Sequence, residues 1–444
     1  MSRAGSVHTN RDFLLLWSGN AVSLIGFHGV RIAYPMLAMS LTDSAAQAGW
    51  VMFALTLPAL IFQIPAGIVA DFADRRRVLI ACVCAGLAAT AIATVVVLTG
   101  MSPPGPVLVA TAFVEGTAYV FFTLSELGAI RDVVTVEQRP AAFAFFEAEQ
   151  PIALVVGRAA GAAVFGAARW LPFAANAVTS VFCLITLAAI RGDFATREAA
   201  PDRRGAVERV REGVRIVWND SFLRLSTAVS GAANLVIQVV ILLMIVGLTQ
   251  QEHPAWTVGA VLAAAGVGGV LGSFAAAPLT RRYSAPVVYR GALWAWTGLL
   301  IPITVGTDPV VLAAAWGGVG AVGTVVNVAL TTFRVDVIPE EALGRAVASV
   351  HLVTDGATAL GGLLAGFLLG MFGTAVTGWT TVAAMLTLAV LGSRVRQRIP
   401  AEPLADPNVG SPLSWSFPGR PRRRARHPLP GRAASADAGR AHRT

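Results

Sequence analysis

The sequence has no lysine and little charge of either sign. Aspartate, glutamate, lysine and arginine together make up 13% of the 444 residues, whereas 55% are hydrophobic. With a mean hydropathy of +0.66, the chain is too apolar to bury its surface in a soluble core of its own. Lipid is therefore the expected solvent, and twelve helical crossings of roughly 20 apolar residues each would use most of the chain.

Cysteine is also scarce, and the motifs of several enzyme classes are missing. Cys82, Cys84 and Cys183 lie in apolar stretches, where they are expected to pack as small hydrophobic residues rather than form disulfides or bind metal. The sequence has no G-x-x-x-x-G-K-[ST] loop, which excludes an ATP-driven pump. It has neither H-E-x-x-H nor G-x-S-x-G, which argues against a membrane-embedded enzyme. We expect no cofactor and no metal.

Arginine, which supplies all 34 basic residues, marks one side of the predicted membrane protein. The expected spans are 13–38, 46–70, 77–99, 107–130, 140–166, 171–190, 222–249, 257–279, 286–306, 310–333, 345–370 and 374–393. Connections after even-numbered spans carry arginine, whereas those after odd-numbered spans carry none except Arg169. Because cytoplasmic loops are rich in basic residues, both termini are predicted to be cytoplasmic. The formal charge of +9 then reflects topology, and no nucleic-acid partner is expected.

A long polar interruption divides the chain into two similar halves. We expect an N-terminal six-helix bundle at 1–190, a cytoplasmic linker at 191–221, a C-terminal six-helix bundle at 222–393 and a disordered basic cytoplasmic tail at 394–444. Residues 131–139 resemble residues 334–342, as expected of repeated halves that form a site at their interface. Apolar residues at helical spacing within 206–218 predict an amphipathic surface helix in the linker.

The connection between the second and third spans carries a motif. The segment from Gly67 to Arg76 resembles the major facilitator signature G-x-x-x-D-R-x-G-R-R. It agrees at Gly67, Asp71, Arg75 and Arg76 and departs at Phe72 and Asp74. A glycine lets two helices approach, and a carboxylate beside arginines can form a breakable ionic latch. A simple basic anchor at a helix end would explain the arginines but not Gly67 and Asp71.

Three further segments, residues 11–20, 212–224 and 339–345, look like the enterobactin-exporter-like and macrolide-efflux-like branch of that superfamily. The resemblance implies an all-α fold of twelve transmembrane helices in two pseudo-symmetric six-helix bundles. It also implies a monomeric transporter in the bacterial inner membrane that exports a drug, antibiotic or siderophore by alternating access, as a proton antiporter in contact with lipid. An uptake permease of the same fold is the alternative, and a receptor or membrane enzyme is the third interpretation.

Ionisable residues within predicted spans are costly in lipid and are therefore candidates for substrate or proton sites. Arg31 lies in the outer half of the first span and Glu115 in the outer part of the fourth, at similar depth. One interpretation pairs them, so that protonation of Glu115 would break the contact during exchange. In the other, each side chain reaches the headgroups separately.

A second group of candidates lies toward the predicted cytoplasmic side. Glu126 is in the fourth span, and Glu147 and Glu149 begin the fifth. Arg158 follows Glu147 by 11 residues and so shares nearly the same helical face. Glu147 can carry protons or attract a cationic substrate, or the group can form a static network between the two helices.

Glycines at 157, 161 and 166 resemble a glycine-rich fifth-helix motif associated with exporters, without its usual Gly-Pro element. The pattern is compatible with export or with close helix packing alone.

The second half offers mainly uncharged candidates. Asn234 and Gln238 are four residues apart and share a face, and Asn327 lies midway along the tenth span. Amides suit a neutral or polyfunctional substrate, and they equally suit hydrogen bonds between helices. His351 and Asp355, also four apart, can relay a proton or form a structural hydrogen bond.

Overall fold

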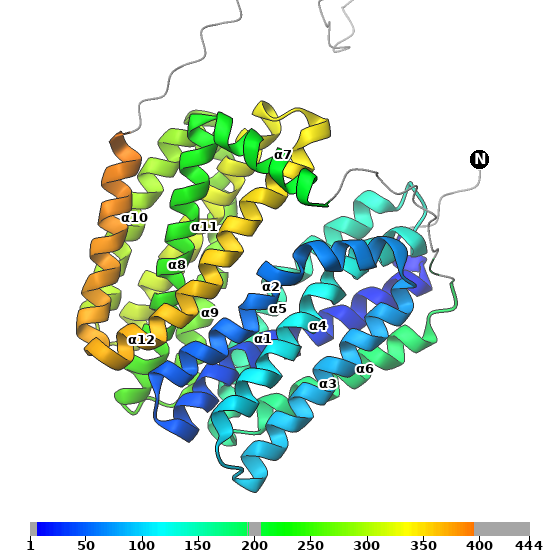
Figure 1. Ribbon diagram of the computed structural model, residues 1–444, viewed down its shortest axis with the longest axis horizontal. Helices are drawn as coiled ribbons and strands as arrows, with labels where there is room; N and C mark the ends of the chain where they lie inside the picture. Colours follow the sequence, from blue (N-terminus) through cyan, green and yellow to red (C-terminus); the bar gives the residue numbers. More distant parts are fainter. Residues whose placement is uncertain (1–6, 193, 195–205, 395–444) are drawn as a thin grey trace, which may run out of the picture. The chain divides into compact units, whose positions relative to one another are not determined.

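The computed structural model describes residues 7–192, 194 and 206–394. In this part of the chain all regular secondary structure is helical, with no strand (Figure 1). A short 3-10 helix, Val7–Thr9, precedes the α-helices. These are α1 (Arg11–Thr42), α2 (Ala45–Phe72), α3 (Arg75–Thr99), α4 (Pro104–Val133), α5 (Arg139–Ala167), α6 (Leu171–Ala189), α7 (Ala206–Asn219), α8 (Ser221–Gln250), α9 (Ala255–Arg282), α10 (Ala285–Val305), α11 (Pro309–Val337) and α12 (Glu340–Arg394).

Local sequence signals set the helix ends. The side chains of Asn10, Ser44 and Asp74 accept hydrogen bonds from backbone N–H groups in the first turns of α1, α2 and α3. Gly100 ends α3 in the left-handed conformation, with φ of 61°, which glycine adopts without strain. Such caps satisfy backbone groups that would otherwise be left unpaired.

The twelve predicted spans correspond to α1–α6, α8–α11 and the two parts of α12. Gly373, with φ of 71° and ψ of −178°, interrupts α12, because only glycine tolerates that backbone geometry readily. The spans thus lie in eleven helices when α12 is counted once, and all of them except α10 are long and apolar enough to cross a membrane, which gives ten in the described chain. The predicted fold class, an all-α membrane protein, is confirmed.

Helices α1–α6 form one bundle and α8–α12 the other (Figure 1). The linker contains α7, which packs on the start of α12. Glu212 of α7 lies 3.4 Å from Arg345 of α12 in an ion pair. Gly213 abuts the backbone of Arg345 so closely that an added Cβ would overlap it. The amphipathic helix expected within 206–218 is therefore present, and it is attached to the second bundle.

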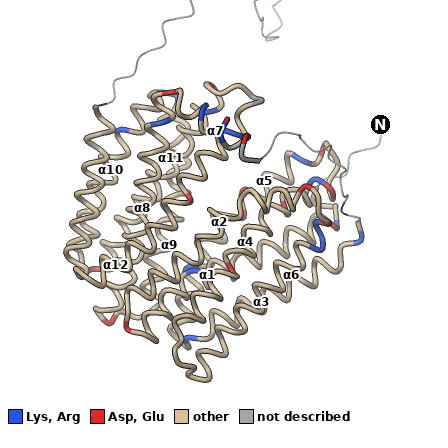
Figure 2. The backbone as a smooth tube through the Cα atoms, viewed as in Figure 1, with Lys and Arg blue, Asp and Glu red and all other residues tan. Residues whose placement is uncertain are grey.

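The bundle ends differ in charge. Connections 73–74, 134–138, 283–284 and 338–339 lie at one end, which we call the arginine-rich end because the helix ends beside them carry Arg75, Arg76, Arg77, Arg131, Arg139, Arg281, Arg282 and Arg334. Connections 43–44, 100–103, 168–170, 251–254 and 306–308 lie at the opposite, arginine-poor end, where Arg169 is the single arginine in these connections. Figure 2 shows charged positions gathered mainly toward the end that bears α7, with long uncharged stretches along the helices. This is the alternation that the sequence predicted.

The hydrophobic core is shared by the two bundles at one end only. In the first bundle, the residues of the shared cluster, such as Leu37, Ala48 and Leu108, come from the arginine-poor half, and they join Ile245 and Leu312 of the second bundle. Near the arginine-rich end, two further clusters each stay within one bundle and its connections. The two bundles therefore pack against each other through one hydrophobic core at the arginine-poor end and have separate cores at the arginine-rich end.

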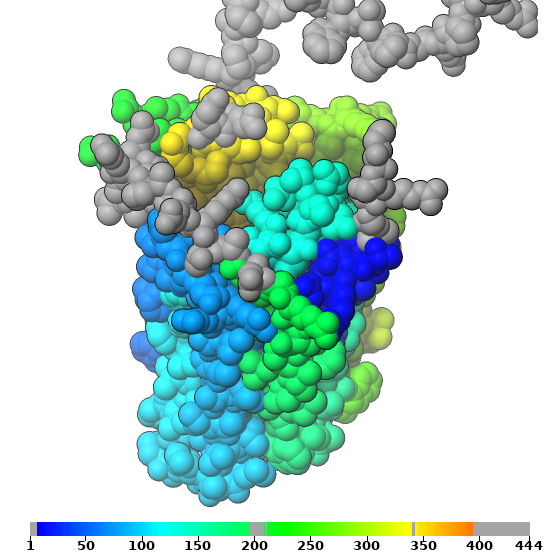
Figure 3. Space-filling view, turned by 90° about the vertical axis from the view of Figure 1, so that its right-hand side faces the viewer, coloured from blue at the N-terminus to red at the C-terminus, as the bar shows by residue number. Residues whose placement is uncertain are grey.

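Close glycine contacts explain how the bundles approach at the arginine-poor end. A Cβ built on Gly49 of α2 would lie 2.7 Å from the Cα of Gly366 in α12, so two backbones touch there. Helices α5 and α9 also pack together. Helices α3 and α6 run side by side on the face shown in Figure 3, and they contribute no residue to the cavity between the bundles.

Candidate functional site

The main polar cavity lies between the bundles and has a volume of about 240 Å³. We call it the central cavity. Its walls come from α1, α2, α4 and α12 and include Arg31, Gln63, Tyr119 and Asp355. Arg31 and Asp355 attract each other electrostatically, although they form none of the described ion pairs. The central cavity is thus lined by one cation from the first bundle and one carboxylate from the second.

A smaller chamber of about 30 Å³ adjoins the central cavity, since both are lined by Arg31, Leu55 and Thr56. We call it the inner chamber. Arg158 of α5 and Gln238 of α8 complete its polar lining, and Ile241 and Ile245 belong to its apolar wall. Both bundles therefore contribute to it. Arg31 and Arg158 are close enough to repel each other.

A third cavity, of about 50 Å³, lies inside the first bundle. We call it the carboxylate chamber because Glu115 and Glu126 line it. Asn176 donates a hydrogen bond of 3.0 Å to Glu115, whose Oε2 atom is buried without a partner. The remaining polar lining is Asn20, Ser23, Tyr119, Thr123, Gln150 and Ser180. A polar space of this size can hold water.

Glu149 extends the acidic character of this region. Its carboxylate accepts a hydrogen bond from Asn20, a residue of the carboxylate chamber, and it repels Glu126 electrostatically. Glu115, Glu126 and Glu149 are 4%, 2% and 4% exposed. No cation forms an ion pair with any of the three within the described chain.

An aromatic pair separates the carboxylate chamber from the central cavity. The rings of Phe27 and Tyr119 are parallel, with centroids 4.2 Å apart. Both residues, together with Thr123, line both spaces. The stack is therefore a thin partition between the buried carboxylates on one side and the charged residues of the central cavity on the other.

The structure does not bring Arg31 and Glu115 together. Glu115 points to Asn176 of α6, whereas Arg31 lines the two spaces between the bundles. Their similar depth follows from helix length, but which faces meet depends on how α1 and α4 are rotated in the bundle. Depth alone could not reveal that rotation.

The inward-facing carboxylate of α5 is Glu149 rather than Glu147, which is exposed. Residues two apart on an α-helix lie on nearly opposite faces, and Phe146, Glu149 and Ala153 form the buried stripe. Glu126 is buried as a neighbour of Glu149, and Arg158 faces the inner chamber. The spacing of 11 residues between Glu147 and Arg158 therefore does not mark the inner face.

The candidate residues of the second bundle do not lie together in one site. Gln238 lines the inner chamber and Asp355 the central cavity. Asn234 is half-buried, Asn327 is exposed on α11, and neither makes a hydrogen bond with a described residue. His351 is exposed and attracts Asp355 electrostatically, but no hydrogen bond joins the two described side chains, so the relay remains a prediction.

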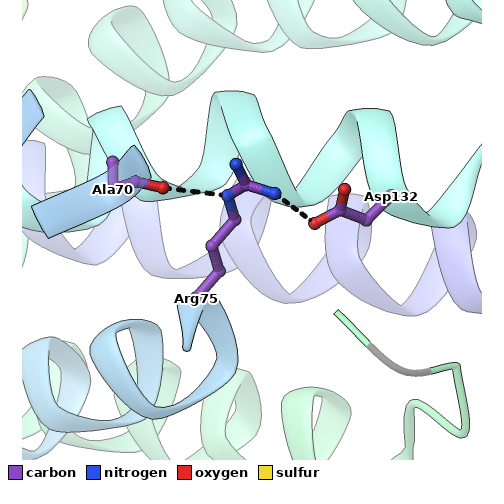
Figure 4. A network of polar contacts seen from close by, with 3 residues as sticks. All are labelled: Ala70, Arg75 and Asp132. Carbon is purple, nitrogen blue, oxygen red and sulfur yellow. Dashed lines mark hydrogen bonds and ion pairs between the residues drawn. The ribbon is translucent and has the colours of Figure 1, made fainter. Parts of the chain in front are cut away.

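At the arginine-rich end, the motif residues contact their own bundle. Arg75 forms a 2.6 Å ion pair with Asp132 of α4 and donates a hydrogen bond of 3.0 Å to the Ala70 carbonyl (Figure 4). Arg76 donates hydrogen bonds to the backbone carbonyls of Leu187 and Ala188 at the end of α6.

The remaining motif residues are free of such contacts. Asp71 is exposed and belongs to none of the described ion pairs, and a Cβ at Gly67 would meet no atom within 4 Å. The expected latch is therefore not engaged across the bundles in this conformation.

Sequence inspection missed several polar residues of these sites, among them Asn20, Tyr119, Asp132 and Asn176, and also His28 of α1, which lines none of the three cavities. A polar residue within an apolar span was the available signal. His28 is the clearest case, because it is 5% exposed and both ring nitrogens are buried without a partner.

Comparison with known proteins decides the family. The family model described as Major Facilitator Superfamily matches residues 16–315. The chain belongs to the major facilitator superfamily. This superfamily member is 27% identical over 406 residues to the multidrug efflux pump Tap of Mycolicibacterium fortuitum, covering 86% of this chain and 96% of that protein.

Solved structures of transporters share the fold of this major facilitator protein. The nucleoside transporter NupG superposes with a TM-score of 0.68 at 13% identity, covering 86% of this chain and 98% of that one. A bacterial homologue of the human lysosomal transporter Spinster, inward-facing and unoccupied, gives 0.65 at 15% identity, covering 87% and 96%. The chain is thus a multi-pass membrane transporter and not an enzyme.

The glycine-rich stretch of α5 packs within this major facilitator bundle. A Cβ at Gly157 would lie 2.5 Å from the Ile25 carbonyl oxygen, and Gly161 abuts the backbone of Gly29. These contacts account for both glycines by close packing of α1 on α5.

Proposed function

We propose that this transporter exports a small organic molecule, of the drug, antibiotic or siderophore type, from the bacterial cytoplasm by alternating access. The observation that carries the proposal is the central cavity, to which both bundles contribute a charged side chain. The similarity to a multidrug efflux pump supports the outward direction.

The core arrangement supports a cytoplasm-facing resting state. If the arginine-rich end is cytoplasmic, as the distribution of arginine favours, the separate cores face the cytoplasm and the shared core seals the outside. Asp71 and Gly67 stand free in this state and would engage when the cytoplasmic end closes. The latch is then a device of the outward-facing state.

We further propose that protons drive the export through the carboxylate chamber. Three buried carboxylates without a neighbouring cation are costly as anions, so proton uptake stabilises them in this conformation. The Phe27–Tyr119 stack lies between these carboxylates and the central cavity, so the carboxylates would take up protons in a space apart from the substrate. Rearrangement of α1 against α4 would then couple proton release to substrate movement.

Transport by everted membrane vesicles tests the proposal. Vesicles containing the transporter and energised by respiration should accumulate compounds from a panel of anionic, neutral and cationic fluorescent molecules. Nigericin and valinomycin in potassium buffer, which together collapse the pH gradient and the membrane potential, should abolish accumulation, and vesicles without the transporter provide the control. Accumulation by right-side-out vesicles instead would favour an uptake permease, and accumulation that survives both ionophores would refute proton antiport.

A further inference from the structure

Arg31 and Arg158 are two guanidinium groups in one membrane-embedded space. They come from α1 and α5 and both line the inner chamber, where the positive charge of Arg31 acts on Arg158. Neither donates a hydrogen bond to a described residue, and neither forms one of the described ion pairs. The Nε atom of Arg158 is buried with no partner.

Arginine remains protonated in proteins, so this charge cannot be removed by loss of a proton. Burial of an unpaired cation is costly, so the arrangement is unfavourable unless an anion binds beside the two guanidinium groups. Close packing of α1 on α5 brings these cations together, so the fold itself maintains the repulsion.

The surrounding groups do not neutralise the pair. Asp355 is the carboxylate that shares a space with Arg31, so the two guanidinium groups outnumber it. Glu115 and Glu126 belong to the carboxylate chamber, behind the Phe27–Tyr119 partition. A positive excess therefore remains between the bundles even if Arg31 and Asp355 pair.

We infer that Arg31 and Arg158 bind an anionic group of the substrate, so that the exported molecule is an organic anion; this inference rests on the proposed function. A carboxylate matches the planar donor fork of arginine, and the Gln238 amide offers a further donor.

The apolar wall suits the body of the same molecule. Met52, Leu55, Ile241 and Ile245 line the inner chamber beside the two arginines. The adjoining volumes, about 240 and 30 Å³, suit a compact molecule with one apolar ring system rather than a large conjugate. The preferred substrate class is a small amphipathic anion.

Equilibrium binding to the purified full chain in nanodiscs tests this inference. The probes are acetate, benzoate, salicylate and 2-naphthoate, each compared with its amide, which has nearly the same shape without the charge. The aromatic carboxylates should bind at least about tenfold more tightly than their amides, because a charge-assisted bidentate contact is lost in the amide. Equal binding of acids and amides, or no binding of any acid, would overturn the inference.

Substitutions separate charge recognition from folding. Arg158→Gln should remove the preference for the acid while leaving amide binding unchanged, and Arg158→Lys should retain part of it. Arg169→Gln is the matched control, because this arginine is exposed and hydrogen-bonds the Ser40 carbonyl at the arginine-poor end. If Arg158→Gln weakens acids and amides equally, Arg158 is structural and the inference fails. Binding is independent of transport direction and of proton coupling, so failure of the vesicle experiment and failure of this one are distinguishable.

Discussion

The two bundles share a fold but differ in what they bury. In the first, Glu115, Glu126 and Glu149 are buried. In the described part of the second, no aspartate or glutamate is buried, and residues 239–246 of α8 form an unbroken buried apolar run. The first bundle therefore holds the buried carboxylates, whereas the second supplies an apolar wall on which Gln238 and Asp355 are placed.

The largest expected effect comes from replacing a buried carboxylate of the first bundle by an amide. Glu115→Gln should abolish accumulation driven by the pH gradient in everted vesicles, because an amide cannot take up and release a proton. Membrane insertion and yield should be unchanged, since the amide can keep a hydrogen bond with Asn176. Thr297→Val, a change of similar size in the interior of the second bundle, is the control and should leave accumulation intact. Unchanged accumulation by Glu115→Gln would remove Glu115 from the coupling role.

Adding one methyl group to the second bundle should impair stability rather than coupling. Gly268 of α9 contacts the Gly317 carbonyl of α11 so closely that Gly268→Ala forces the helices apart, at a cost of about 1–3 kcal/mol. Thermal unfolding in detergent measures the loss. Gly291→Ala on α10 meets no atom within 4 Å and should unfold no earlier than the native protein. Equal melting temperatures for the two variants would contradict the packing of α9 on α11.

The arginine-rich ends of the two bundles also differ in whether their arginines are buried and paired. Arg75 is buried and paired with Asp132, whereas Arg281 at the corresponding end of the second bundle is exposed. Arg75→Gln should destabilise the protein by about 1–3 kcal/mol, because it leaves the Asp132 carboxylate and the Ala70 carbonyl without their donor. Arg281→Gln should change stability by less than about 0.5 kcal/mol. A double-mutant cycle with Asp132→Asn checks whether the Arg75 effect is carried by the ion pair.

The smallest effect on stability is expected at Asp71. Because its side chain is exposed and outside the described ion pairs, Asp71→Asn should shift unfolding by less than about 0.5 kcal/mol. Transport should nevertheless slow if the latch closes in the opposite state. Site-directed spin labels at residues 136 and 337, which are exposed at the arginine-rich ends of the two bundles, would report the loss of the closed population. A normal transport rate would leave Asp71 without a gating role.

Much of the fold could be predicted because hydropathy and arginine placement act over whole helices. All twelve expected spans have helical counterparts, and only Gly373 needed backbone geometry to divide α12 into two spans. The site was less predictable because it depends on helix rotation. Glu147 and Glu149 differ by two positions and lie on opposite faces, and no local pattern identified Asn176 as the partner of Glu115.

Because of the shared core at the arginine-poor end, the conformational step of the transport cycle should depend strongly on temperature. Opening that end would wet side chains such as Leu37 and Ile245, which are fully buried here, and exposure of apolar surface raises heat capacity. The conformational step should thus have a curved temperature dependence. Cooling weakens the hydrophobic attraction that seals this end, so the state open at the arginine-poor end should gain population in the cold.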